Sequence, residues 1–422
     1  MESEDKRGVQ KKPIRVWVDG CFDLFHFGHA NAFRQARSLG DKLIVGVHND
    51  REITEHKGPP VFNEQERYRL VRAVKWVDEV IEGAPYVTYL DTLDKYDCDF
   101  AAHGDDIVTT ATGVNTYQLV KDAGRYKEFR RTEGISTTEL LSRILKRLKQ
   151  LRDQRHGDED HALRRSHSVD SVVSTGVDLL RSSKNCGTKR HSPTNSGDSD
   201  TDHSHSTTPS GPNWSTGGMS YMPNTLRITQ FCLSQHSLDG FREPTPDDIV
   251  VYAPGAYDLF HIGHLSFFEK CMELGTYLLI GLHSDRNANF ESRRMGCIMT
   301  LQERLLSVLA CRYVHNVIID APYKIPASLL DNFKVNYVVV GMDTKLIPTL
   351  DGEDPMLIPK QRNIFRRLDS GSTVTTASVI SRILKNRLLY EKRNRSKEAK
   401  ESKEIYASLK DSPSCVELAV NQ

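Results

Sequence analysis

The clearest candidates for chemistry are two histidines three positions apart, His26 and His29, with Gly28 between them. They follow the β-branched and aromatic run VWVDG and precede residues with helical spacing, so they are predicted to lie where a strand gives way to a helix. A helix start offers backbone N–H groups and a positive dipole end to an anion, and glycine permits close approach. This pattern suits phosphoryl chemistry, although a single histidine near a strand end is more often structural.

A sequence repeat supports a functional role for the two histidines. The run VWVDGCFDLFHFGHANAFRQARSLGDKLIVGVHND aligns without a gap with a second run, VYAPGAYDLFHIGHLSFFEKCMELGTYLLIGLHSD, and places His26 and His29 on His261 and His264. The similarity resumes further on and ends with SRIL at 142 and again at 381. The whole domain is therefore duplicated.

The duplication predicts the domain organisation. Residues 13–150 form the first domain and 222–391 the second, with a charged tail at 392–422 that we expect to be frayed. Residues 151–221 are rich in Ser, Thr, His, Asp and Gly and poor in large apolar residues. Such a stretch cannot offset its ordering entropy by burial, so it is predicted to be a disordered linker.

Each copy alternates short β-branched runs with amphipathic stretches, which predicts an α/β fold with a parallel sheet and crossover helices. The expected architecture is two tandem Rossmann-like domains. In the first copy, strands are predicted at 14–18, 42–48 and 97–103, and helices at 29–39, 64–75 and 137–151, the last entered through Ser136 as N-cap.

Composition restricts the function classes. Lysine and arginine number 57 and aspartate and glutamate 56, so no net field would attract a nucleic acid or an anionic bilayer. No stretch reaches the apolar length of a membrane span, and the start does not resemble a signal peptide. We expect a cytoplasmic protein without stable membrane insertion. The eight cysteines contain no CxxC pair, which argues against a structural zinc site.

Two motifs in the first copy resemble a known family. HFGH at 26–29 and RTEGISTT at 131–138 together are similar to the two signatures of the cytidylyltransferases, which belong to the HxGH nucleotidyltransferase superfamily. The resemblance implies transfer of CMP from CTP to a phosphorylated alcohol, with release of pyrophosphate and with Mg²⁺ accompanying the CTP. No carboxylate cluster in the sequence marks a metal site held by the protein.

The choice of acceptor rests on further resemblance. The tandem duplication, HKGPPVF at 56–62 and the lack of a long basic amphipathic helix after the domain resemble family members that act on phosphoethanolamine. Phosphocholine is the alternative acceptor. The implied pathway is phospholipid biosynthesis leading to phosphatidylethanolamine, which is compatible with a peripheral location at the endoplasmic reticulum. The sequence leaves a homodimer open.

The resemblance also implies a set of site residues in the first copy. His26, His29, Lys57 and Arg131 are expected to be catalytic and to contact the phosphates of CTP. Tyr86 and Lys75 are expected at the acceptor, Tyr86 through a cation–π contact with its ammonium group, with core packing and solvation as the respective alternatives. The remaining residues expected to bind CTP are Cys21, Phe22, Asp23, His103, Gly104, Asp105, Ser136 and Thr137.

The second copy retains only part of this set. Its equivalents are His261, His264, Thr375 and Thr376, whereas Arg131 aligns with Ser370. Lys57 falls on Ser292 or Arg294, depending on where an insertion is placed, and His103 and Asp105 become Val340 and Met342. We therefore predict that the first copy is catalytic and the second supporting or ligand-sensing. A nucleotide-sensing scaffold without catalysis is the alternative from another class.

Overall fold

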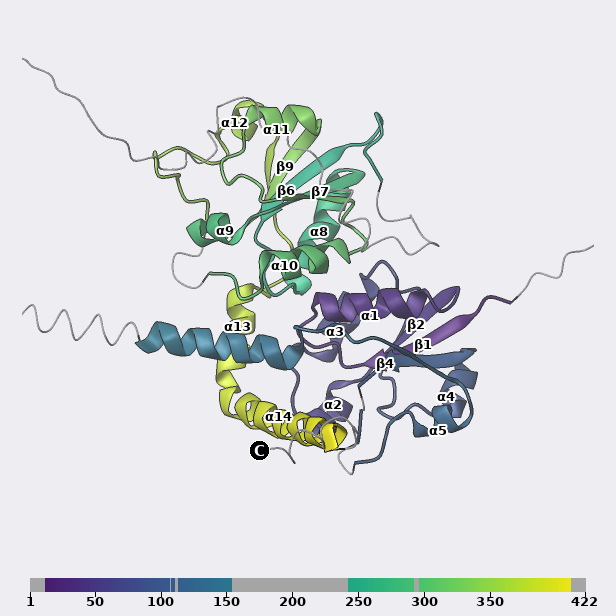
Figure 1. Ribbon diagram of the computed structural model, residues 1–422. Coiled ribbons are helices and arrows are strands. Elements are labelled where there is room, and N and C mark those ends of the chain that lie inside the picture. The colour runs from purple at the N-terminus through teal and green to yellow at the C-terminus, as the bar shows by residue number, and fades with distance from the viewer. Residues whose placement is uncertain (1–11, 107, 111–112, 154–241, 292–295, 411–422) are drawn as a thin grey trace, which may run out of the picture. The chain divides into compact units, whose positions relative to one another are not determined.

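The computed structural model describes residues 12–106, 108–110, 113–153, 242–291 and 296–410 (Figure 1). The predicted linker at 151–221 lies outside these residues except for its first three positions, and so does the start of the predicted second domain at 222–241. The described parts contain two similar α/β halves, and their elements are named below by the labels of Figure 1.

The first half is built on a five-stranded parallel sheet with the order β3-β2-β1-β4-β5. Helices connect the parallel strands, as the alternating sequence pattern predicts. The strands are β1 (Arg15–Gly20), β2 (Lys42–Val47), β3 (Glu79–Glu82), β4 (Phe100–Gly104) and β5 (Tyr126–Phe129). The helices are α1 (Phe27–Arg37), α2 (Asp50–Lys57), α3 (Glu64–Arg72), α4 (Leu90–Lys95), α5 (Gln118–Asp122) and a closing helix over residues 137–153.

The second half repeats this topology, with strands in the order β10-β9-β6-β7-β8, again all parallel. The prediction of two tandem Rossmann-like domains is confirmed. The strands are β6 (Val250–Gly255), β7 (Tyr277–Leu282), β8 (Asn316–Ile319), β9 (Val335–Gly341) and β10 (Phe365–Leu368). The helices are α8 (Ile262–Leu274), α9 (Asp285–Glu291), α10 (Leu301–Leu309), α11 (Ala327–Asn332), α12 (Leu357–Gln361), α13 (Thr376–Lys385) and α14 (Arg387–Lys410).

The same local rules start equivalent helices in both halves. Helix α3 begins with a capping box in which Asn63 and Glu66 satisfy each other's backbone N–H groups, and α10 does the same with Thr300 and Glu303. The closing helix begins behind Ser136, whose hydroxyl accepts the Glu139 N–H at 3.1 Å, as predicted for an N-cap.

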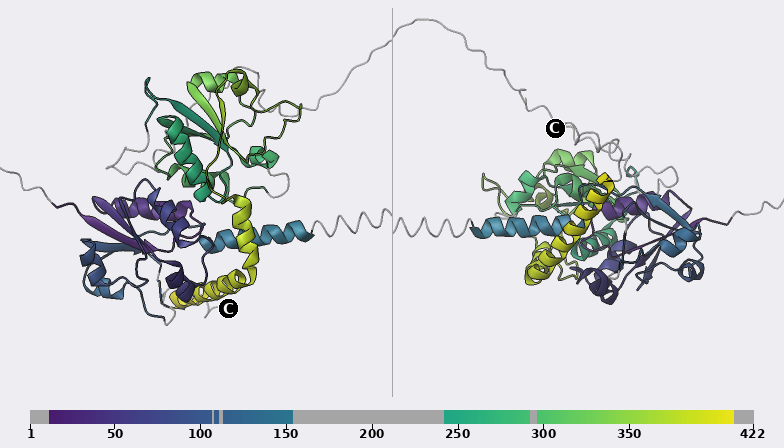
Figure 2. Two further views of the ribbon diagram at one scale, coloured as in Figure 1. Left: turned by 180° about the vertical axis from the view of Figure 1, so that it is seen from behind. Right: turned by 60° about the horizontal axis from the view of Figure 1, so that its bottom comes forward.

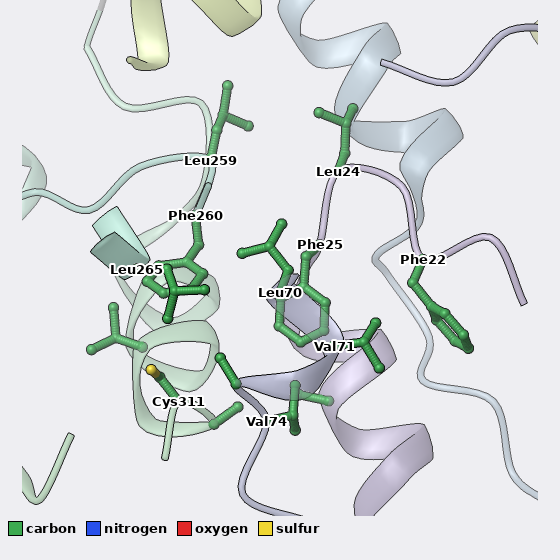
Figure 3. Packing of buried hydrophobic residues seen from close by; sticks show 14 of the residues in the cluster. Phe22, Leu24, Phe25, Leu70, Val71, Val74, Leu259, Phe260, Leu265 and Cys311 are labelled. Carbon is green, nitrogen blue, oxygen red and sulfur yellow. The ribbon is translucent and has the colours of Figure 1, made fainter. Parts of the chain in front are cut away.

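One hydrophobic cluster spans the two halves, and each half also has a smaller cluster of its own. Figure 3 shows Phe25 and Val74 of the first half close to Leu265 and Cys311 of the second, and all four belong to a single cluster of buried residues. Burying apolar side chains from both halves together ties them into one unit.

Polar contacts between the halves come in equivalent pairs. The backbone N–H of Lys75 donates to the Ala310 carbonyl at 2.9 Å, and the backbone N–H of Arg312 donates to the Ala73 carbonyl at 2.8 Å. The two bonds flank an antiparallel β-bridge between Val74 and Cys311. The repeats thus contact each other through the same surface on each, as the subunits of a twofold dimer do.

Two ion pairs repeat this symmetry. Arg143 of the first half donates to Glu303 at 2.8 and 2.9 Å, and its equivalent Arg382 donates to Glu66 at 2.7 and 2.8 Å. Both glutamates are buried and are the same residues that form the capping boxes, so each ion pair also fixes the start of a helix.

The charged segment near the C-terminus corrects the predicted tail. Residues 392–410 were expected to be frayed, but they continue α14 (Arg387–Lys410). Figures 1 and 2 show this helix running past α2 of the first half. Tyr390, on its first turn, is fully buried, and its hydroxyl donates to the Pro60 carbonyl at 3.3 Å. None of the helices within the described residues has the length and apolarity needed to cross a membrane.

Candidate active site

A strained loop joins β1 to α1 in the first half. Phe22 and Leu24 both have positive φ values, 54° and 46°, which non-glycine residues adopt rarely. The buried Asp23 carboxylate stabilises the loop by accepting the backbone N–H groups of Leu24, Val61 and Phe62 at 2.8 to 2.9 Å. Asp23 therefore positions the loop, and its contact with CTP stays a prediction.

The two histidines follow directly. His26 is the N-cap of α1, and its Nδ1 accepts the Gly28 N–H at 3.1 Å. In the neutral ring, Nε2 must then carry the proton. The ring of His29 stacks on that of His26 with centroids 3.9 Å apart. A Cβ on Gly28 would lie 2.8 Å from the His26 ring, so only glycine fits at this position.

A cavity of about 660 Å³ opens at this loop. It lies beyond the carboxyl ends of β1 and β4, where the order of the strands reverses and where parallel sheets bind their ligands. Most predicted site residues line it together: Cys21, Phe22, Asp23, His26, His29, Lys57, Tyr86, His103, Gly104, Arg131, Ser136 and Thr137.

Burial and two nearby cations determine the charge state of His29. Burial, together with the positive charges of Arg131 and Lys57, lowers its pKa to about 3. His29 is therefore a neutral imidazole at physiological pH. Its Nδ1 is buried without a hydrogen-bond partner among the described residues. The positive charges of Arg131 and Lys57 make this part of the cavity suited to an anion.

Two aspartates hold Arg131 in place. Its backbone N–H donates to Asp105 at 2.9 Å, and its guanidinium donates to Asp106 at 2.9 Å. Asp106 lines the cavity, whereas Asp105 is not among the lining residues. The prediction that Asp105 contacts the nucleotide thus finds no support, because its side chain faces the backbone of Arg131.

The start of the closing helix borders the cavity. Thr137 donates its hydroxyl to the Asp23 carbonyl at 2.9 Å, which joins the second signature to the strained loop. Ser136 caps the helix, so its hydroxyl and the first backbone N–H groups lie together beside the cavity. The second signature is thus bonded to the loop that leads into the histidine motif, about a hundred residues earlier in the chain.

Aromatic residues and a carboxylate form another part of the lining. Tyr86 is buried and stacks on His56 with ring centroids 4.0 Å apart, and the Lys57 Nζ lies 5.6 Å from the Tyr86 ring centroid. Asp19, at the end of β1, is buried and accepts hydrogen bonds from Trp17, Thr88 and Tyr117. The sequence analysis missed three lining residues, Asp19, His56 and Asp106. The only signal for them in the sequence is that each lies near the end of a strand or a helix.

Lys75 does not lie in the cavity. Its ammonium donates to the Val314 carbonyl of the second half at 2.8 Å, the counterpart of Arg312 donating to Val77 at 2.8 Å. The expectation that Lys75 contacts the acceptor is therefore corrected: its charge serves the contact between the repeats.

The donor set for a resident metal ion is missing from the described residues. No three His, Cys, Asp or Glu side chains gather there in a way that could hold a metal. The one aspartate next to the histidines, Asp23, already binds three backbone N–H groups. The residues present therefore do not fit a metal ion held by the protein.

The equivalent place in the second half is arranged differently. His261 caps α8 as His26 caps α1, and its ring stacks on His264 with centroids 3.8 Å apart. However, the His261 Nε2 lies 3.3 Å from the Thr376 hydroxyl, and a Cβ on Gly263 would lie 2.1 Å from the Val374 carbonyl oxygen. Both aligned positions for Lys57, 292 and 294, lie outside the described residues.

The first half is a Rossmann-like α/β domain whose cavity is lined by two histidines at a helix start and by Lys57 and Arg131. A family model described as cytidylyltransferase-like matches residues 17–143 and 252–353. The chain is 46% identical over 390 residues to ethanolamine-phosphate cytidylyltransferase of Mus musculus, covering 92% of this chain and 90% of the relative. It is 42% identical over 393 residues to the enzyme of that name from Dictyostelium discoideum, covering 93% and 97%. The chain belongs to the cytidylyltransferase-like family.

A relative with another acceptor in its name matches less of the chain. Choline-phosphate cytidylyltransferase A of Mus musculus is 43% identical over 138 residues, which are 32% of this chain and 38% of that relative. The similarity to the ethanolamine-phosphate enzymes thus extends over both halves, and that to this choline-phosphate enzyme over a single stretch.

Proposed function

We propose that this protein transfers CMP from CTP to phosphoethanolamine, giving CDP-ethanolamine and pyrophosphate. The observation that carries the proposal is the cavity in the first half, where the HxGH motif, Lys57, Arg131 and the start of the closing helix meet. The long similarity to ethanolamine-phosphate cytidylyltransferases supports the choice of acceptor.

The cationic groups suit a triphosphate. Lys57 and Arg131 are close enough to His29 to lower its pKa, so their charges and the two imidazoles act on one small volume. Arginine binds phosphate through parallel hydrogen bonds, and a helix start adds backbone N–H donors. CTP phosphates would be held between the histidines on one side and Arg131 with Ser136 on the other.

The acceptor carries an ammonium group that requires different chemistry. Tyr86 offers an aromatic face, and the buried Asp19 carboxylate offers negative charge, and both line the same cavity. An ammonium group is attracted to both kinds of partner. We infer that these two residues orient phosphoethanolamine with its phosphate towards the nucleotide.

The reaction needs positioning more than proton transfer. A phosphate oxygen of phosphoethanolamine attacks the α-phosphorus of CTP, the bond from that phosphorus to the oxygen bridging to the β-phosphate breaks, and pyrophosphate leaves. The attacking oxygen is already anionic, so no general base is required. The Nε2 proton of His26 and the cations Lys57 and Arg131 would stabilise charge that develops on the phosphates.

Magnesium would enter with the nucleotide. Because the described residues offer no cage for a metal, Mg²⁺ bound to CTP phosphates fits better than a resident ion. When bound, it would neutralise part of the phosphate charge.

The test is pyrophosphate release by the purified protein with CTP, Mg²⁺ and one acceptor at a time. We expect kcat/KM to be highest with phosphoethanolamine, above phosphocholine and glycerol 3-phosphate. A preference for phosphocholine would contradict the acceptor, and no release with any acceptor would favour the nucleotide-sensing scaffold.

A further inference from the structure

The cavity of the first half is completed by a segment that follows the second half. Helix α14 contributes five lining residues, Leu389, Tyr390, Lys392, Arg393 and Ser396. No signature of the first half includes them, and they lie more than 230 residues further along the chain than the closing helix of that half. The site is therefore composite.

Two anchors fix the part of α14 that borders the cavity. Tyr390 is fully buried and donates to the Pro60 carbonyl in the loop after α2. Asn394 is 6% exposed, and its side-chain amide donates to the Thr138 carbonyl at 3.4 Å and the Ser142 hydroxyl at 3.2 Å on the closing helix. Arg393 lies between these two anchors, so its backbone is held between the loop after α2 and the closing helix.

The charge of Arg393 acts on the active-site loop. Its Cδ is the atom nearest to a Cβ built on Gly58, at 3.7 Å, which places it beside the residue that follows Lys57. Burial raises the pKa of Asp23, and the positive charge of Arg393 opposes that rise. The arginine thus lies beside the residue that follows Lys57, and its charge acts on the loop that leads to the histidines.

No carboxylate among the described residues forms an ion pair with Arg393, although its helix neighbours Arg387 and Arg395 both pair with Glu391. Its guanidinium contacts the ring of Tyr390 at 5.1 Å from the centroid, which supports it without neutralising it. A guanidinium at the wall of this cavity that forms no ion pair with a carboxylate of the described residues is suited to bind a phosphate.

We propose that Arg393 is a further substrate-binding residue of the first-half site and binds a phosphate group of a substrate. This inference rests on the proposed function. The phosphate could belong to CTP or to the acceptor, which share this chemistry. The position of Arg393 beside the Lys57–Gly58 loop makes the triphosphate the expected source.

The experiment compares Arg393→Ala, Arg393→Lys and the matched control Arg395→Ala, which removes an arginine that is 79% exposed on the same helix and outside the cavity lining. CTP affinity is measured by titration calorimetry, and KM is measured separately for CTP and phosphoethanolamine. Losing one charge-assisted contact should weaken CTP binding about tenfold in Arg393→Ala. Arg393→Lys should recover part of the loss, and Arg395→Ala should stay within about twofold.

A rise in the KM for phosphoethanolamine alone would assign the phosphate to the acceptor and still support the proposal. Equal behaviour of Arg393→Ala and Arg395→Ala would overturn it. So would a lower melting temperature with both substrate affinities unchanged, which would show a structural role. Wild-type protein that binds CTP without releasing pyrophosphate would defeat the proposed function but still allow Arg393 to be judged by CTP affinity; wild-type protein that does not bind CTP would defeat both.

Discussion

The two halves have the same topology and the same paired histidines, yet their sites differ. In the first half, the nearest non-histidine atom to a Cβ on Gly28 would be the Ile135 Cγ2 at 3.1 Å, whereas in the second half the Val374 carbonyl would lie 2.1 Å from a Cβ on Gly263. The segment equivalent to RTEGISTT therefore lies directly on the histidine motif of the second half. Arg131 donates to Asp106, whereas the equivalent Ser370 forms hydrogen bonds with Ser372 in its own turn.

This difference explains how a motif can persist without its chemistry. The first histidine of each pair caps a helix by accepting a backbone N–H at 3.1 Å, from Gly28 in one half and Gly263 in the other. Asp23 and Asp258 likewise clamp equivalent strained loops. These roles are structural, so they can be needed in both halves even if only one half binds a nucleotide.

The largest expected effect comes from removing the second histidine of each pair. His29→Ala should lower kcat/KM for CTP by about 10²- to 10³-fold, because it removes a group that the proposed function places at the reacting phosphates. His264→Ala should leave kcat/KM for CTP within a few-fold of wild type. Steady-state kinetics with CTP and phosphoethanolamine measures both, and comparable losses in the two variants would break the proposed division of labour.

Removing either of the two equivalent arginines between the halves should lower the stability of the protein by a similar amount. Arg382→Ala leaves the buried Glu66 without its cation, and Arg143→Ala does the same to Glu303. Each change should lower the free energy of unfolding by about 2 kcal/mol, since a buried charge loses its partner. Urea unfolding measures this.

Lys270→Ala, which breaks an exposed pair with Glu273, is the matched control and should change stability by less than about 0.5 kcal/mol. If either interface variant were as stable as this control, the pseudo-symmetric contact would not hold the repeats together.

The extent to which the sequence predicts the site depends on how local each signal is. The β1 strand, the histidine pair and the Ser136 cap were readable because each depends on neighbouring residues. The family resemblance implies Asp105 as a nucleotide contact, whereas the structure has Asp106 in the cavity lining and Asp105 bonded to the backbone of Arg131. Which of two adjacent side chains enters a cavity depends on the backbone after the end of β4, which the residue pattern does not specify.

Contacts across the repeats could not be predicted in this way. Lys75 lies just after a helix, and its sequence context gives no sign that a carbonyl of the second half accepts its proton. The segment 392–410 lacks an apolar period, so its charge suggested a tail. Its order depends on Tyr390 and Asn394 binding residues about 250 to 330 positions away.

The stability of the folded protein should also depend on pH. Burial lowers the pKa of His264 to about 3 and that of His315 to about 4, and His29 behaves similarly. The unfolded chain protonates these groups near pH 6.5, so it binds more protons than the folded chain below that pH. Stability should therefore be unaffected above about pH 6.5 and fall as the pH is lowered towards 4.

Each such histidine contributes a slope of up to about 1.4 kcal/mol per pH unit. Urea unfolding at a series of pH values measures the slope, and His264→Gln should reduce it by about one proton's contribution. An unchanged slope in that variant would show that His264 is protonated in the folded protein, contrary to the burial of its imidazole.

A binding first half and a supporting second half are best distinguished by the number of CTP molecules bound per chain, measured by titration calorimetry. We expect one CTP per wild-type chain, no measurable binding in His29→Ala, and one CTP in His264→Ala. Two CTP molecules per chain, or binding that survives in His29→Ala and disappears in His264→Ala, would contradict this division between the halves.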